Sequence, residues 1–170
     1  MPITIDGSGT ISGVSATGIS TAQTVTSVGR SALPAGSVLQ TIQSVVTAGF
    51  SSSSSTFVTT GLAASITPTS ASNKILIIAS LQTAQLASNQ PINETVYRNS
   101  TNLGSSFGIA GTYTQSGGYT VTTNSICYLD SPSTTSSTTY TIYARSETGS
   151  SFSLGANGQP LTITLMEISA

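Results

Sequence analysis

Short apolar segments recur along this chain at intervals of roughly ten residues, and residues that favour turns separate them. Within these segments apolar residues alternate with Ser, Thr and Asn, which is the two-residue period of a strand, and helical spacing of apolar residues is lacking. We therefore predict strands at residues 38–46, 56–60, 62–66, 74–81, 92–98, 103–109, 119–129, 139–145, 151–154 and 160–168, with serine-rich loops at 51–55 and 131–137. This spacing predicts an all-β protein, an antiparallel β-sandwich of jelly-roll type over residues 37–170.

Residues 74–81 are the strongest of these predicted strands. Ile75 and Ile77 fall on one face of the strand, and Leu76 and Ile78 fall on the other. Because both faces are apolar, the pattern predicts that other layers cover this strand on both sides. The residues that the three best strands should turn toward the core are Ile75, Ile77, Leu81, Ile142, Leu161, Ile163 and Leu165.

The first 36 residues differ in composition from the rest of the chain. They are rich in glycine, and no large aromatic residue occurs before Phe50. A segment so poor in bulky side chains cannot bury enough apolar area to order itself alone. We predict that residues 1–36 form an extended attachment arm that becomes ordered against another protein or another copy; the alternative is a disordered tail. The β-branched and aliphatic residues expected to make the attachment include Ile3, Ile5, Ile11, Val14 and Ile19.

Charge is scarce in this sequence. Only 5% of the residues are charged, against about 25% in typical soluble domains. The four basic residues cannot neutralise a phosphate backbone, which excludes nucleic acid as a partner. Serine and threonine, 61 residues in all, supply the polar surface instead, and the 37% of hydrophobic residues suffice for one core.

The sequence shows neither a secretion signal nor a membrane span. Residues 1–9 lack the basic and apolar regions of a signal peptide, and the longest apolar run, 75–79, is far too short to cross a bilayer. We expect synthesis in a cytoplasm and no membrane insertion. The single cysteine, Cys127, cannot form an internal disulfide, and we expect it to be a small buried apolar side chain.

Few residues in this chain could support catalysis. The absence of histidine removes the commonest general base and metal ligand. Among the five acids, Asp6 lies in the arm, and Asp130 lies beside a turn, where we expect it to accept backbone N–H groups. We expect Glu167 to pair with Arg98, with Arg145 or with a neighbouring subunit. Glu94 and Glu147 fall near predicted loops and could meet across a sugar. We predict no enzymatic activity, no catalytic residues, no metal site and no cofactor.

Four aromatic residues are candidates for contact with a glycan. They are Tyr97, Phe107, Tyr113 and Tyr119, and they lie in a stretch rich in Asn, Gln, Ser and Gly. Aromatic faces framed by amides and hydroxyls suit the C–H faces and hydroxyl groups of a neutral sugar. The alternative is that these rings belong to the ordinary core and turns of the sandwich.

Several runs resemble a module found in virion proteins of tailed phages. The resembling runs are 3–13, 36–43, 61–78, 128–132, 139–142 and 161–168, and the first of them looks like the opening of aquatic-phage fibre proteins. The resemblance implies a homotrimeric, β-rich virion appendage with no catalytic residues. Independently, a nearly uncharged β-rich chain without a disulfide gains stability by burial in a symmetric assembly.

Two virion roles follow, and both place the protein in the phage particle. The first is a trimeric tail fibre that attaches to the tail or baseplate through residues 1–36 and faces the host surface, with a host glycan as its candidate ligand. The second is a trimeric capsid decoration protein that contacts the major capsid protein and stabilises the head. A cell-surface adhesin and a glycan-cleaving tailspike are the remaining alternatives; the missing secretion signal and the scarcity of acids count against them.

Overall fold

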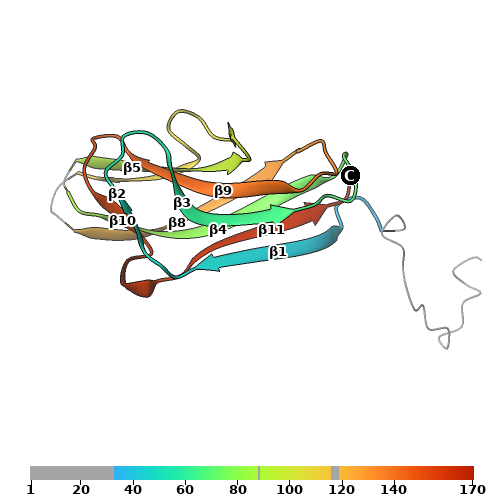
Figure 1. Ribbon diagram of the computed structural model, residues 1–170, viewed down its shortest axis with the longest axis horizontal. Helices are drawn as coiled ribbons and strands as arrows, with labels where there is room; N and C mark the ends of the chain where they lie inside the picture. Colours follow the sequence, from blue (N-terminus) through green and yellow to red (C-terminus); the bar gives the residue numbers. More distant parts are fainter. Residues whose placement is uncertain (1–32, 88, 116–118) are drawn as a thin grey trace, which may run out of the picture. The chain divides into compact units, whose positions relative to one another are not determined.

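A computed structural model describes residues 33–87, 89–115 and 119–170. Almost all regular structure in these residues is β (Figure 1). The elements are β1 (Val38–Val46), β2 (Phe50–Ser52), β3 (Val58–Ile66), β4 (Lys74–Gln85), β5 (Gln90–Arg98), β6 (Thr101–Asn102), β7 (Ala110–Thr114), β8 (Thr120–Asp130), β9 (Thr138–Ser146), β10 (Phe152–Leu154), the 3-10 turn η3 (Ala156–Gly158) and β11 (Leu161–Ile168). The arm residues Ile3, Ile5, Ile11, Val14 and Ile19 lie outside the described residues.

The first sheet is built around β4. On one edge, β8 pairs antiparallel with β4 along its whole length of 11 residues, in unbroken register. On the other edge, β11 pairs with residues 74–80 of β4, and β10 pairs with residues 83–85. β1 lies beside β11, and β2 lies beside β10. β10 and β11 together therefore occupy one strand position of the sheet, and β1 and β2 together occupy the next.

The second sheet is built around β9. β3 pairs with one edge of β9 and β5 with the other, both antiparallel. β7 and β6 pair with successive parts of the remaining edge of β5. The register of β3 shifts between Thr59 and Ala63, and Gly61 there has φ 82°. A glycine at positive φ is the usual residue of such a bulge, so the two strands predicted on either side of Gly61 are one bulged strand.

The strand order identifies the topology. β1 and β2 count as one interrupted strand, as do β6 and β7, and β10 and β11. With the strands numbered in this way along the chain, the neighbours in the first sheet are the first strand (β1 with β2), the last (β10 with β11), the third (β4) and the sixth (β8). The second sheet has the order second, seventh, fourth and fifth. Two antiparallel sheets with this order form a jelly roll. The predicted fold class is confirmed.

The core lies between the inner faces of the two sheets. All seven residues predicted to face it are fully buried, at 0% exposure. The largest buried side chains that join them are Tyr140, in the middle of β9, and Phe152, in β10. Phe152 packs edge-on against Phe50 of β2, with ring centroids 6.1 Å apart. The period-two reading of the best strands therefore placed the core correctly.

The predicted strand at 103–109 is wrong, and three short strands, β2, β6 and β7, were missed. Residues 103–109 form the connection between β6 and β7, with a tight turn in which Gly108 N donates to Ser105 O at 3.0 Å. The strand β7 begins just after this connection, and the strand β2 occupies part of the predicted loop 51–55. Gly104 and Gly108 break the pattern physically, because the turn needs Gly108 at φ +80°.

The prediction that layers cover both faces of β4 is also wrong for the single chain. Ile75 and Ile77 face the core, but Leu76 is half-buried and Ile78 is 39% exposed. Cys127, which pairs with Ile78 across β4 and β8, is exposed and not buried as expected. The outer face of the first sheet therefore carries apolar side chains that no other described part of this chain covers.

Both ends of the described chain lie at one end of the sandwich. Gly36 N donates to Ser169 O at 2.9 Å, and Ser169 N donates to Ser37 O at 3.0 Å. Ala170 N donates to Oδ1 of Asn73, the residue before β4. The β2–β3 and β9–β10 connections lie at the opposite end (Figure 1). The sandwich thus has a terminal end and a distal end.

Candidate functional site

The outer face of the second sheet carries an aromatic cluster. Tyr97 of β5 stacks on Tyr143 of β9, with ring centroids 4.0 Å apart and planes 29° apart. Phe57, just before β3, packs edge-on against Tyr97 at 6.4 Å. All three rings are half-buried, so part of each remains open to solvent. Strand alternation causes this clustering, because residues that point outward from adjacent strands become neighbours.

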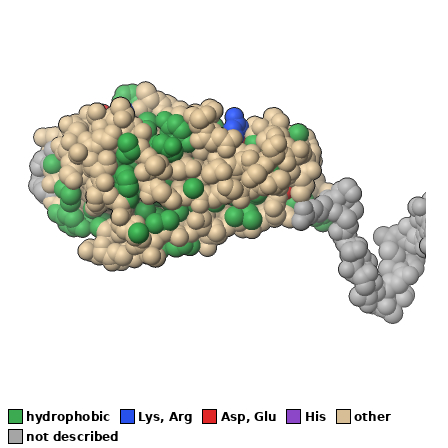
Figure 2. All heavy atoms as spheres, viewed as in Figure 1, with side chains coloured by type: hydrophobic (Ala, Val, Ile, Leu, Met, Phe, Trp, Pro, Cys, Tyr) green, Lys and Arg blue, Asp and Glu red, His purple; other side chains and the backbone are tan. Residues whose placement is uncertain are grey.

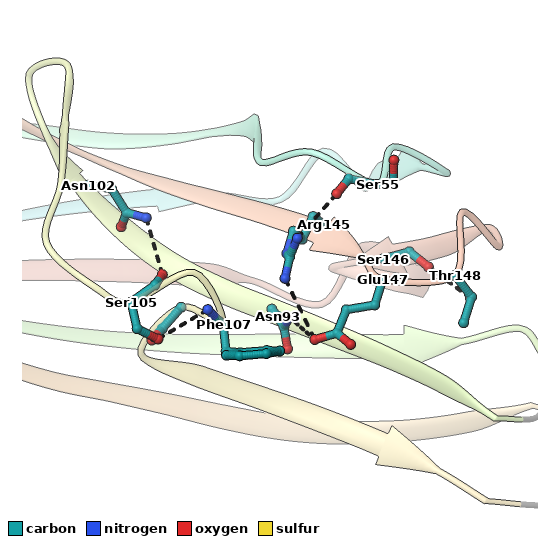
Figure 3. Close-up of polar contacts among 10 residues, drawn as sticks. Ser55, Asn93, Asn102, Ser105, Phe107, Arg145, Ser146, Glu147 and Thr148 are labelled. Atoms are coloured by element: carbon teal, nitrogen blue, oxygen red, sulfur yellow. Dashed lines mark hydrogen bonds and ion pairs between the residues drawn. The ribbon is translucent and has the colours of Figure 1, made fainter.

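Arg145 adjoins this cluster toward the distal end. Its guanidinium carbon lies 5.1 Å from the centroid of the Phe57 ring, which is a cation–π geometry. Its Nη2 lies 3.6 Å from Oε1 of Glu147, and that oxygen also accepts a 2.6 Å hydrogen bond from Asn93 Nδ2 (Figure 3). Its Nη1 donates to Ser55 O at 3.4 Å. The face thus places a cation, an anion and an amide side by side.

The β6–β7 connection folds over β5 beside these groups. Thr95 Oγ1 donates to Asn102 Oδ1 at 2.6 Å, and Ile109 N donates to Glu94 O at 2.8 Å. A Cβ on Gly108 would lie 2.4 Å from Glu94 O, so only glycine allows the loop to approach β5 this closely. The turn holds Phe107 outward at 65% exposure, through a bond from its N–H to Ser105 Oγ (Figure 3).

The four aromatic residues predicted from the sequence fall in different places. Tyr97 lies within the aromatic cluster, Phe107 on the β6–β7 turn, and Tyr113 on the same outer face, where it pairs with Pro91. Six residues of β5 separate the levels of Tyr97 and Tyr113, a span of about 20 Å. Tyr119 lies apart, exposed just before β8 of the first sheet. The structure brings three of the four onto one elongated face.

Four residues of this face were not among the candidates predicted from the sequence, namely Phe57, Asn93, Tyr143 and Arg145, whereas Glu147 was named there as an acid that could meet a sugar. The signal for two of them was present. β9 alternates buried Tyr140, Ile142 and Ala144 with outward residues, which places Tyr143 and Arg145 on the outer face. Phe57 could not be assigned, because its position depends on how β3 enters the sheet. We name the set Phe57, Asn93, Tyr97, Phe107, Tyr143, Arg145 and Glu147 the aromatic face.

The two glutamates that could have met across a sugar do not face each other. Glu147 lies on the aromatic face, whereas Glu94 of β5 points into the sandwich and is fully buried. Burial raises the pKa of the Glu94 carboxyl, although hydrogen bonds from Thr83 Oγ1 and from Asn124 Nδ2 act to lower it. No cation pairs with Glu94 in the described part of the chain. This carboxyl belongs to a buried polar network and has no access to a ligand.

The other two described acids have structural partners. Asp130 accepts bonds from Arg98 Nη1 at 2.8 and 3.0 Å and from the Tyr140 hydroxyl at 2.7 Å, so its expected backbone partners are wrong. Burial, and then the Asp130 carboxylate, raise the pKa of Tyr140. Glu167 was expected to pair with Arg98, with Arg145 or with a neighbouring subunit. Its partners within the described chain are instead neutral donors, on Gln40, Thr69 and Asn73. Burial alone would raise the pKa of Glu167, yet these bonds outweigh it and leave the pKa lowered.

Within the described ranges, no three His, Cys, Asp or Glu side chains gather in a way that could hold a metal ion. The same ranges contain no helix with the length and apolar character needed to cross a membrane. The aromatic face itself presents three rings in contact, an amide and one ion pair.

Comparison with known proteins gives structural neighbours only. No family model matches the chain, and neither does any curated protein. A T=1 particle derived from infectious bursal virus is similar over 79% of this chain and 37% of that one, with a TM-score of 0.45 and 14% identity. The VP2 subviral particle of infectious bursal disease virus has a TM-score of 0.41 and 16% identity, again over 79% of this chain and 39% of that one. The chain thus spans less than two fifths of these viral proteins.

Proposed function

We propose that this protein is a structural protein of a phage virion, a homotrimeric tail fibre. Residues 1–36 attach it to the tail or baseplate, and the sandwich faces the host surface. The proposal combines the resemblance of the quoted sequence runs to tailed-phage virion proteins with the jelly-roll strand order, which recurs in viral coat and lectin domains. Fold alone does not assign function, so the sequence runs and the position of the termini contribute independent support.

The position of the chain ends is the observation that carries the proposal. Gly36 and Ser37 are bonded to Ser169, so residues 1–36 join the sandwich at its terminal end. The β2–β3 and β9–β10 connections project from the opposite end. Attachment through the first residues would therefore act at the terminal end, and the distal end would point away from the point of attachment.

Host contact is assigned to the aromatic face. The rings of Tyr97, Tyr143 and Phe107 offer surfaces for the C–H face of a sugar, and the carboxylate of Glu147, held by Asn93, offers an acceptor for hydroxyl groups. Only 5% of the residues are charged, and few charged side chains appear on the surface in view in Figure 2. On the aromatic face, Arg145 and Glu147 are paired with each other, which favours a neutral ligand. We propose a neutral host surface glycan.

Deletion of residues 1–30 tests the attachment. The truncated protein should keep its β circular dichroism spectrum but fail to enter phage particles when it is supplied during assembly. Incorporation at normal occupancy would overturn attachment through the arm. In that case the sandwich itself would hold the protein on the particle, as expected of a capsid decoration protein.

A glycan array probed with the full-length protein tests host contact. Phe107→Ala should weaken binding to any neutral glycan found by about tenfold, which corresponds to about 1.4 kcal/mol. Leu86→Ala removes an exposed apolar side chain at the distal end and is the matched control. Equal binding by both variants would contradict the assignment of this face.

A further inference from the structure

The outer face of the first sheet is a patch of apolar side chains on adjacent strands. Leu76 lies between Met166 of β11 and Leu129 of β8, and in the next row Ile78 lies opposite Cys127. Val38 adjoins them at the start of β1, opposite Ile168. Leu129 is 50% exposed and Val38 is 51% exposed, although both lie within strands. We name the six residues Val38, Leu76, Ile78, Cys127, Leu129 and Met166 the apolar face.

This face is almost free of charge. Of the side chains that the described residues of β1, β4, β8 and β11 turn outward, only Lys74, at the terminal end, is charged. Thr164 lies beside Ile78 in the same row, and Thr162, Ser80 and Ser125 lie side by side in the next outward row. Copies of such a face can approach one another without like-charge repulsion and without the cost of desolvating ions. The face is therefore electrostatically suited to further copies of itself.

The edge of the sheet next to this face is also unprotected. β8 pairs only with β4 in the described chain, and it has no bulge in its register. Residues 120–129 of β8 contain no charged residue, no proline and no glycine. Proteins normally protect a long edge strand with a charged side chain, a proline or a β-bulge. By contrast, β1 and β3, the other long edge strands, both have register shifts.

We infer that the apolar face is the surface through which copies of this chain contact one another in the homotrimer, turned toward the threefold axis and covered by the two neighbouring copies. The inference rests on the proposed homotrimer and names its interface. Two-sided apolar patterning of residues 74–81 then has a physical reason, because core residues cover one face of β4 and neighbouring copies cover the other. The aromatic face, on the opposite side of the sandwich, stays free for a ligand.

The size of the sheet is sufficient for such an interface. Four strand positions at about 4.8 Å spacing and about 11 residues at about 3.3 Å each give a face of roughly 700 Å². Stable specific interfaces bury about 800 Å² on each partner. Coverage of this face together with the exposed edge at β8 reaches that range.

The native cysteine allows a test on the unmodified protein. In the assembled full-length protein, Cys127 should react with a maleimide at least about tenfold more slowly than in the urea-unfolded chain, because its thiol would be covered. Reaction as fast in the assembled protein as in the unfolded chain would overturn the inference.

A charge placed on the face provides the second test. Leu129→Asp should convert the trimer to monomers in light scattering, while Leu86→Asp, at 45% exposure on the distal end, should remain trimeric. Circular dichroism melts establish that each variant is folded, and the labelling of Cys127 decides the matter if Leu129→Asp does not fold. A trimer that persists in folded Leu129→Asp overturns this interface and leaves the homotrimer standing. A wild-type monomer at micromolar concentration overturns the homotrimer itself and the interface with it.

Discussion

Replacement of Leu81 by alanine is expected to destabilise the sandwich strongly. Leu81 lies in β4 with 0% exposure, inside the core cluster. The substitution removes three carbon atoms, which costs about 2.4 kcal/mol in transfer free energy at about 0.8 kcal/mol per carbon. Because neighbouring strands hold the backbone of β4 on both edges, the site cannot collapse fully, and the cavity raises the total to about 3–4 kcal/mol.

Leu86→Ala is the matched control, since the side chain is the same and lies five residues further along the chain. Leu86 follows the end of β4 and is 45% exposed, so its truncation should cost less than about 1 kcal/mol. Urea unfolding, followed by the fluorescence of the six tyrosines, measures the free energy of unfolding of both variants. All measurements are made at one protein concentration, because assembly makes stability depend on concentration. Equal losses for the two variants would refute the placement of the core.

Three further predictions concern carboxyl groups and one loop. Glu94→Gln should raise the melting temperature at pH 8 more than at pH 4. The reason is that the pKa of Glu94 is raised in the folded protein, so the wild type loses stability as the pH rises above the unfolded pKa of about 4.3. A difference in melting temperature that does not depend on pH would contradict an ionisable buried Glu94. Glu167→Gln should destabilise the protein near pH 7, and the difference should shrink in acid, because stability from a carboxyl with a lowered pKa is present above about pH 4.3 and is lost as pH falls through the folded pKa. Thermal melts of Glu167→Gln and the wild type at pH 3 and pH 7 measure this change, and an equal difference in melting temperature at the two pH values would refute the prediction. Gly108→Ala should cost more stability than Gly158→Ala in urea titrations: both have positive φ, which costs about 1–3 kcal/mol, but only at Gly108 would the new Cβ meet backbone. Equal costs would show that the β6–β7 loop is not held against β5.

The strand alternation in this sequence was sufficient for the fold class and the core. β1 was predicted with its observed bounds, and the seven core residues are all buried. The errors lie where local pattern and tertiary context differ. In the β6–β7 connection, apolar Leu103 and Ile109 suggested a strand, but the close approach of Gly108 to Glu94 makes the segment a loop.

The candidate sites could be predicted less well from the sequence than the fold. Which residues share an outer face depends on strand order, and no local pattern reveals that β9 lies between β3 and β5. Tyr97 and Tyr143 therefore could not be paired in advance, although they are in stacking contact. The apolar outward side chains of β4 were visible in the sequence, but their lack of a cover within one chain was not.

The location of the protein in the phage particle tests the central claim most directly. Electron microscopy of particles with gold-labelled antibody against the sandwich should show label at the tail. Particles assembled with the protein that lacks residues 1–30 should show no label. Label spread over the head would contradict the fibre proposal in favour of a decoration protein, and purified particles that lack the protein altogether would contradict a virion role.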